Sequence, residues 1–221
     1  MSSNIMLESV GSSFNDFDLQ NARDKTLEVI LRSAKQIVPG MIEKEAKQII
    51  VNIQKSLGAP TSWHPPQIRF GSNTLLTFGR AGEEPKILQE NDIYFIDIGP
   101  IFKGHEGDVG RTFYVGHNPL HEKCCKDVEA IWNQVYRHWK NHNISGKELY
   151  EFADQQAKEF GWILSLENAN GHRIADFPHA AKMRSSIESL VTTPKSNRWI
   201  LEIQIKHPSE SFGAFYEDLL T

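Results

Sequence analysis

A pair of aspartates framed by two strand-like segments is the feature that most constrains the fold of this chain. The stretch runs from Asn91 to Gly116 and reads NDIYFIDIGPIFKGHEGDVGRTFYVG. β-Branched and aromatic residues precede Asp97 and follow Asp108, and glycines lie between the two aspartates. This arrangement predicts a β-hairpin that carries both carboxylates.

The register of the hairpin decides how the two carboxylates meet. A turn centred near Phe102 and Lys103 places the aspartates directly opposite each other, whereas a turn shifted toward Gly104 makes them diagonal neighbours. Either register sets their Cβ atoms roughly 5 to 8 Å apart. Two buried carboxylates at this range repel each other unless a cation lies between them. The alternative is a surface hairpin with solvated aspartates, but strong β-formers seldom lead into an aspartate that has no partner.

The composition is that of a globular protein, and it argues against several partners. Hydrophobic residues make up 39% of the 221 residues and charged residues 24%, with a net charge of −4 and no basic block, so we expect no nucleic-acid partner. No apolar run approaches the ~20 residues that span a bilayer, and no secretion signal is recognisable, so we expect no membrane partner. The only cysteines, Cys124 and Cys125, are adjacent and form no disulfide framework, which favours a cytoplasmic location.

Periodicity along the chain predicts alternating helical and strand-rich regions. We expect a flexible N-terminal segment over residues 1–14 and a single domain over residues 15–221. Apolar residues recur at helical spacing in four segments, which are Asp18 to Val38, Glu43 to Leu57, Glu122 to His138 and Lys147 to Phe160. We expect a short strand from Thr74 to Phe78 and a well-alternating strand from Trp199 to Ile205. Pro65 and Pro66 argue against a central strand in their own segment.

A repeated pattern suggests that the chain contains two similar halves. A break at glycine, an acidic amphipathic helix and a second glycine occur twice, in VPGMIEKEAKQIIVNIQKSLG and in ISGKELYEFADQQAKEFG. Gly40 and Gly146 mark the two breaks, and strand-rich sequence follows each unit. We therefore predict an α+β fold built from two related halves. The competing interpretation is that any two amphipathic helices look alike.

Further ligand-type residues follow the hairpin. Glu202 interrupts the apolar strand WILEIQI, and an internal glutamate needs a cation or hydrogen-bond donors. His172 lies in NGHRI, and Glu217 follows two aromatic residues near the C-terminus. A site rich in carboxylates with one imidazole suits Mn, Co, Fe or Zn.

These motifs together resemble the pita-bread metallopeptidases, from about Asn15 to the C-terminus. That family includes methionine aminopeptidases, Xaa-Pro aminopeptidases, prolidases and the non-peptidase creatinase. The hairpin is similar to the segment that carries the family's first two ligands, and GHEGDVGRTF is closest to the Xaa-Pro branch. NGHRI is similar to the ligand-histidine segment, and WILEIQI and FYEDLL are similar to the two segments that carry ligand glutamates.

The resemblance implies a fold, a metal centre and an activity. The fold would have two pseudo-symmetric halves around a curved antiparallel sheet. Two divalent ions, with Mn as the first choice, would be held by Asp97, Asp108, His172, Glu202 and Glu217. Glu202 would also carry the catalytic proton, and His179 would face the substrate. The protein would be an aminopeptidase that hydrolyses the first bond of a peptide with a free N-terminus, with Xaa-Pro peptides as one class.

The chain departs from the family pattern in ways that leave alternatives open. A histidine usually precedes the first aspartate, where this chain reads LLTF at positions 75 to 78, and His64 lies too far upstream to take that place. Ala175 stands where a glycine is usual. One alternative is a catalytically impaired binding module, and another is a creatinase-type hydrolase of a small C–N compound. Trp132 and Trp139 leave a homodimer open, although such residues are more often in the core.

Overall fold

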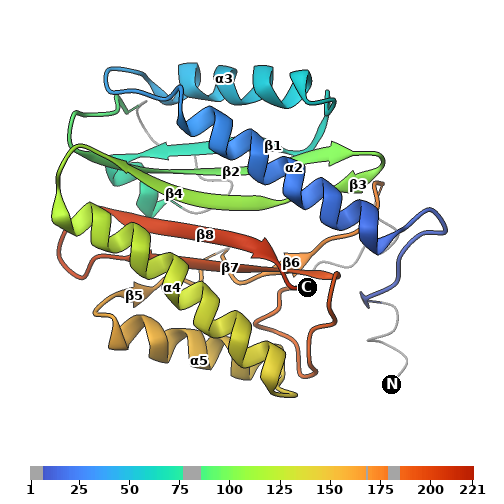
Figure 1. The fold of residues 1–221 in the computed structure, drawn as a ribbon. Helices are drawn as coiled ribbons and strands as arrows, with labels where there is room; N and C mark the ends of the chain where they lie inside the picture. The colour runs from blue at the N-terminus through green and yellow to red at the C-terminus, as the bar shows by residue number, and fades with distance from the viewer. Residues whose placement is uncertain (1–6, 77–85, 168, 179–184) are drawn as a thin grey trace.

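The computed structural model describes residues 7–76, 86–167, 169–178 and 185–221 (Figure 1). Its α-helices are α2 (Asp16–Ala34), α3 (Glu43–Ser56), α4 (Pro119–Asn141) and α5 (Gly146–Glu159), and a 3-10 helix, η1, covers Gly71–Leu75. Its strands are β1 (Ser62–Phe70), β2 (Asp92–Phe102), β3 (His105–Glu106), β4 (Val109–Val115), β5 (Ile163–Leu164), β6 (His172–Arg173), β7 (Trp199–Lys206) and β8 (Gly213–Leu219).

The strands form one antiparallel sheet whose order mirrors itself about its centre. The order is β1-β2-β4-β8-β7-β5, and β3 and β6 pair with β2 and β7. Strands β1, β2 and β4 follow the first pair of helices in the chain, and β5, β7 and β8 follow the second pair. The predicted pair of related halves is therefore present, and the two halves meet where β4 lies beside β8 (Figure 1).

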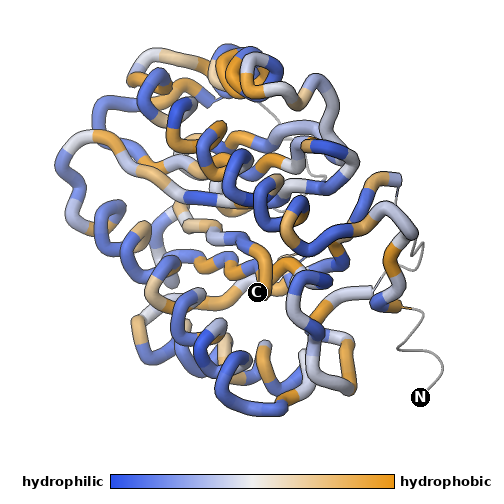
Figure 2. The backbone as a smooth tube through the Cα atoms, turned by 45° about the vertical axis from the view of Figure 1, so that its right-hand side comes forward, coloured by the Kyte–Doolittle hydropathy of each residue, from blue (hydrophilic) through white to orange (hydrophobic). Residues whose placement is uncertain are grey.

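Each half has its own hydrophobic core between the sheet and its two helices. Helices α2 and α3 pack on β2 and β1, while α4 and α5 pack on β7, β8 and β5 (Figure 1). The helices alternate between hydrophobic and hydrophilic segments, as Figure 2 shows, because only one side of each helix packs on the sheet. Trp132 and Trp139 lie buried in the second core, which explains them without an interface. None of the described helices combines the length with the hydrophobicity that a membrane-spanning helix requires.

The central hairpin turns at Lys103 and Gly104, which both have positive φ angles of 49° and 70°. Such a two-residue turn matches the natural twist of a hairpin. Asp97 consequently pairs with Gly110, so Asp108 is the diagonal neighbour of Asp97. The second of the two predicted registers is therefore the one that the chain adopts.

Two segments differ from the sequence-based expectation in an informative way. Pro65 and Pro66 do lie within a strand, but β1 is at the edge of the sheet, where a missing N–H is tolerated. The predicted strand from Thr74 is wrong over its described part, because Gly71–Leu75 forms the 3-10 helix η1. Thr74 is held there by a hydrogen bond from the N–H of Gly213 to its Oγ1, at 2.9 Å.

Side chains hold the two halves together where β4 meets β8. Only one pair of Cα partners, Gly110 and Glu217, is in register between these strands. The Thr112 side chain takes the place of further backbone hydrogen bonds between these strands. Its Oγ1 donates to the carbonyl of Phe215 at 2.8 Å and accepts from the N–H of Phe215 at 2.7 Å. Arg111 donates to the carboxylate of Asp218, which is also held by Arg23 of α2.

Replacing Asp218 tests this junction. We expect Asp218→Asn to lower the free energy of unfolding by about 3 kcal/mol, because it leaves the charges of two arginines without their buried partner. Urea unfolding in the presence of a chelator would measure the loss. The matched control is Asp24→Asn, whose carboxylate pairs with Arg23 but is 71% exposed, and which should cost less than about 1 kcal/mol. Equal small effects in both variants would show that the junction does not depend on this ion pair.

Candidate metal centre

Alternation along the strands places the predicted carboxylates on the face of the sheet opposite the helices. Ile96 and Ile98 belong to the first core, so Asp97 between them points to the other face. Leu201 and Ile203 belong to the second core in the same way, so Glu202 also points away from the helices. The Glu202 carbonyl accepts a hydrogen bond from the Tyr150 hydroxyl of α5 at 2.9 Å, which anchors that strand to the helix layer.

Strand register then brings the carboxylates into one row across the junction of the halves. Asp97 pairs with Gly110, Gly110 with Glu217, and Glu217 with Glu202. Gly110 is required in this row, because a Cβ atom there would lie 2.5 Å from Cε1 of Phe215 and 2.9 Å from Cβ of Glu217. Asp108 lies two residues before Gly110 and is 1% exposed.

His172 of β6 reaches the same centre. Its Nε2 lies 3.0 Å from Oδ2 of Asp108 and 3.2 Å from Oε1 of Glu217. Its Nδ1 lies 2.8 Å from the carbonyl oxygen of Arg173. A carbonyl oxygen only accepts, so Nδ1 carries the hydrogen and Nε2 is the atom directed at the carboxylates.

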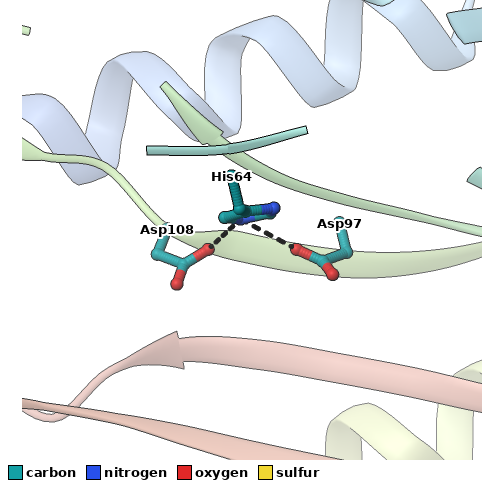
Figure 3. Close-up of side chains that lie close together, drawn as sticks. All are labelled: His64, Asp97 and Asp108. Atoms are coloured by element: carbon teal, nitrogen blue, oxygen red, sulfur yellow. Dashed lines mark hydrogen bonds and ion pairs between the residues drawn. The ribbon is translucent and has the colours of Figure 1, made fainter. Parts of the chain in front are cut away.

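A second imidazole, from His64, lies across the two aspartates, and the sequence analysis had set it aside. Figure 3 shows its ring beside the paired carboxylates of Asp97 and Asp108, with Nε2 at 3.6 Å and 3.3 Å from their Oδ1 atoms. His64 was set aside as a substitute for the missing histidine because of its distance along the chain, and the fold nevertheless brings it to the two aspartates. A usable signal existed: with no histidine at positions 75 to 78, His64 is the only histidine between α2 and the hairpin.

Burial shifts the protonation of most of the carboxylates. It raises the pKa of Asp97 to about 6 and that of Glu202 to about 7, and it raises the pKa of Glu217 well above its usual range. Asp108 is the exception: burial alone would raise its pKa, but hydrogen bonds from the two imidazoles outweigh burial and lower it. The same pairing raises the pKa of His172, although burial by itself lowers it.

The pKa of His64, which lies on the other side of Asp108, is also raised. Burial lowers the pKa of the His64 imidazole, but the charge of Asp97 and the hydrogen bond to Asp108 outweigh burial and raise that pKa to about 9. Without a metal, the centre therefore keeps its carboxylates together by holding protons on carboxyls and imidazoles.

The residues fit divalent cations. Two groups have ligand atoms within 4.8 Å of one another, namely His64 with Asp97 and Asp108, and Asp108 with His172 and Glu217. Within the described part of the chain, Oε2 of Glu217 is buried and accepts no hydrogen bond, and Oδ2 of Asp108 is buried with Nε2 of His172 3.0 Å away. Buried carboxylate oxygens without donors are costly, and a cation would satisfy them. Carboxylate and imidazole donors without thiolates suit the first-row divalent metals.

Glu202 is the one predicted ligand that belongs to neither group. Its Oε2 accepts a hydrogen bond from the N–H of Gly171 at 2.7 Å, and its strand partner is Glu217. It therefore lies beside the centre with one oxygen already occupied. His179, the predicted substrate-facing histidine, lies outside the described residues, as does Thr77 of the segment that lacks a histidine.

Comparison with known proteins agrees with this architecture. The chain is 25% identical over 172 residues to the Xaa-Pro dipeptidase of Pyrococcus furiosus, covering 74% of this chain and 48% of that protein. The chain thus spans about half the length of that relative.

Solved structures match over nearly the whole chain. The prolidase of Thermococcus sibiricus gives a TM-score of 0.79 at 18% identity, covering 98% of this chain and 59% of that one. The X-Pro aminopeptidase of Thermotoga maritima gives 0.76 at 19% identity, covering 98% and 61%. These likenesses establish the pita-bread fold.

A family model decides the classification. The model of metallopeptidase family M24 matches residues 18–221, which include the hairpin, both helix pairs and every residue of the carboxylate row. Membership of a metallopeptidase family implies divalent metal ions. The chain belongs to metallopeptidase family M24.

Proposed function

We propose that this protein is a dinuclear metal-dependent aminopeptidase that hydrolyses the N-terminal bond of peptides, with Xaa-Pro peptides as the first class to test. The observation that carries the proposal is the convergence of Asp97, Asp108, Glu217 and His172 on one buried centre, with Glu202 beside it. The proposal covers residues 15–221 as one domain with residues 1–14 as its N-terminal segment. The described part of that segment packs on the domain, where Leu7 accepts from Arg173 at 2.6 Å and Glu8 from Trp199 at 2.8 Å. The Pyrococcus furiosus relative is named as an Xaa-Pro dipeptidase, which supports that substrate class.

The donor set supports a pair of cations held by Asp97, Asp108, His172, Glu202 and Glu217. Oxygen donors predominate, so manganese is the first candidate, and Co, Fe and Zn are the alternatives. When bound, such ions supply positive charge for a carbonyl oxygen and bring the pKa of water toward neutrality.

Glu202 would move the proton in this proposal. Burial raises its pKa to about 7 in the metal-free chain, and beside the ions its carboxylate would accept and return a proton. Because Oε2 accepts the Gly171 N–H, Oε1 is the oxygen left for the exchange. The proton would come from the attacking water and would go to the leaving amine.

Selection of a free N-terminus would follow from the position of the acidic centre. Asp97, Asp108, Glu202 and Glu217 are all buried there, and a peptide's free amino terminus would face them and the ions that they hold. An acetylated terminus has no free amine to place there. His179 would hydrogen-bond the carbonyl at the cleaved bond.

Two further proposals concern the setting of the protein. Burial raises the pKa of the Cys124 and Cys125 thiols, which keeps them protonated and unreactive and suits a reducing, cytoplasmic location. The homodimer remains a proposal to be tested by light scattering, since the buried tryptophans no longer argue for it.

Metal analysis of an aspartate variant tests the ligand assignment. We expect about two divalent ions per chain in the unaltered protein and a sharp loss in Asp108→Asn, because Asp108 belongs to both ligand groups. Asp92→Asn is the matched control, since Asp92 is a buried carboxylate of the same strand pair that caps the Gln89 N–H instead. Retention of both ions in Asp108→Asn would reject the assignment.

Metal binding should release protons. The centre holds protons on His64, whose pKa is about 9, and partly on Glu202 and Asp97, whose pKa values are about 7 and 6. A cation displaces these protons, so its affinity should fall as the pH falls from 8 to 6. His172 and Glu217, whose pKa values are also raised, add to these, so calorimetry at pH 7 in buffers of different ionisation enthalpy should report the release of at least about one proton per chain. Heats that do not depend on the buffer would contradict this account.

Peptide digestion tests the activity. With Mn or Co bound, short Xaa-Pro and Met-Xaa peptides should lose their first residue, and their N-acetylated forms should stay intact. Glu202→Gln should lower kcat by about 10²- to 10⁴-fold, because it removes the proton carrier. Bound metal without any cleavage would favour a binding module, and turnover of a small C–N compound alone would favour a creatinase-type hydrolase.

A further inference from the structure

His64 reaches the metal centre from the edge strand β1, outside the ligand set that the family resemblance supplies. It is 6% exposed, and its Nε2 lies 3.3 Å from Oδ1 of Asp108 and 3.6 Å from Oδ1 of Asp97. Two ligand atoms that each lie about 2.1 Å from the same ion are roughly 3 to 3.6 Å apart. The imidazole is therefore at the spacing of a third ligand to one ion.

The orientation of His64 matches that of His172. In each case Nδ1 faces the carbonyl oxygen of the following residue, Pro65 at 3.0 Å and Arg173 at 2.8 Å. Each Nε2 is thereby directed at two carboxylates, with Asp108 common to both pairs. A hydrogen bond from the second nitrogen is the usual way in which a protein fixes a metal-binding imidazole.

The backbone of β1 is irregular at the position of His64. Its pairing with β2 shifts register between Ser62 and His64 and again between His64 and Gln67. Such bulges redirect side chains and are common beside active sites. Pro65 and Pro66 occupy the interval where pairing is lost, so the missing N–H groups cost nothing there.

The partner strand leaves room for the ring. Gly99 of β2 pairs with His64, and a Cβ atom at Gly99 would lie 2.3 Å from Cδ2 and 2.5 Å from Nε2 of the imidazole. The Trp63 ring packs against both imidazoles, with centroids 4.5 Å from His64 and 5.3 Å from His172. Bulge, glycine and tryptophan together hold the His64 ring over the aspartates.

We propose that His64 Nε2 is a ligand of the cation held by Asp97 and Asp108, so that each ion of the pair has one imidazole. This inference rests on the proposed dinuclear centre. It assigns one histidine from each half of the molecule: His64 from β1 and His172 from β6, on either side of Asp108.

Cobalt loading counts the imidazoles directly. In the Co(II)-loaded, unaltered protein, each coordinated histidine should give one strongly shifted, exchangeable ring N–H resonance in the proton spectrum. We expect two such resonances, since both Nδ1–H groups are held by backbone carbonyls. A single resonance that disappears in His172→Phe would overturn the inference, and this measurement does not depend on whether a His64 variant folds.

Variants assign the second resonance to a residue and measure how much that residue contributes to the affinity for Co(II). His64→Phe keeps a ring in the space beside Gly99, and it should abolish one resonance and weaken binding of one of two Co(II) ions by at least about 10- to 100-fold. His117→Phe, at an exposed position after β4, is the control and should change neither. Unfolding curves in a chelator should be compared so that a loss of folding is recognised.

The outcomes separate this inference from the proposed function. Two ions bound with equal affinity in His64→Phe and in the unaltered protein would overturn the role of His64 and leave the dinuclear centre standing. An unaltered protein that binds no divalent ion would overturn both. Loss of one ion and one resonance in His64→Phe alone, with no change in His117→Phe, would establish the ligand.

Discussion

Repulsion among four buried carboxylates is the constraint around which the rest of this structure is arranged. Asp97, Glu202 and Glu217 lie on three different strands, and Asp108 lies in the turn that leads into a fourth. None of these carboxylates can move away from the others unless strand pairing is broken. Burial removes the water that would otherwise screen them. The fold therefore keeps a fixed negative centre, which protons relieve in the metal-free chain and divalent cations relieve better, because one ion meets several oxygens at once.

Much of this centre was predictable because it depends on local rules. Alternation along a strand and a short turn are enough to put Asp97 and Asp108 on one face, and the apolar neighbours of Glu202 are enough to show that it needs a partner. Only the register stayed open, since it depends on whether Lys103 accepts a positive φ. It does, at 49°, and the aspartates become diagonal rather than direct neighbours.

The position of His64 was not predictable from such rules. The two prolines that follow His64 predict an irregular edge strand, and β1 is indeed at the edge of the sheet. A side chain of an edge strand can nevertheless reach the centre of a curved sheet. That delivery needs two register shifts and the glycine at position 99 on the neighbouring strand. Each is a long-range property that no window of the sequence contains. The 3-10 turn at Gly71–Leu75 was missed for the same reason, because its partners, Gly213 and Gln204, lie far along the chain.

The mirror order of the sheet divides the centre unequally between its halves. The group of His64, Asp97 and Asp108 lies within the first half, so it is complete once the hairpin and β1 have paired. The group of Asp108, His172 and Glu217 exists only after β8 docks against β4, where the backbone ladder is short and side chains such as Arg111 make the junction.

Arg111 also donates to the carbonyl of Glu217 at 2.6 Å, which couples the ligand's backbone to the ion pair with Asp218. The stability of the junction between β4 and β8 thus directly determines whether the group of Asp108, His172 and Glu217 forms. The group of His64, Asp97 and Asp108 depends on the junction only through Asp108, which both groups share.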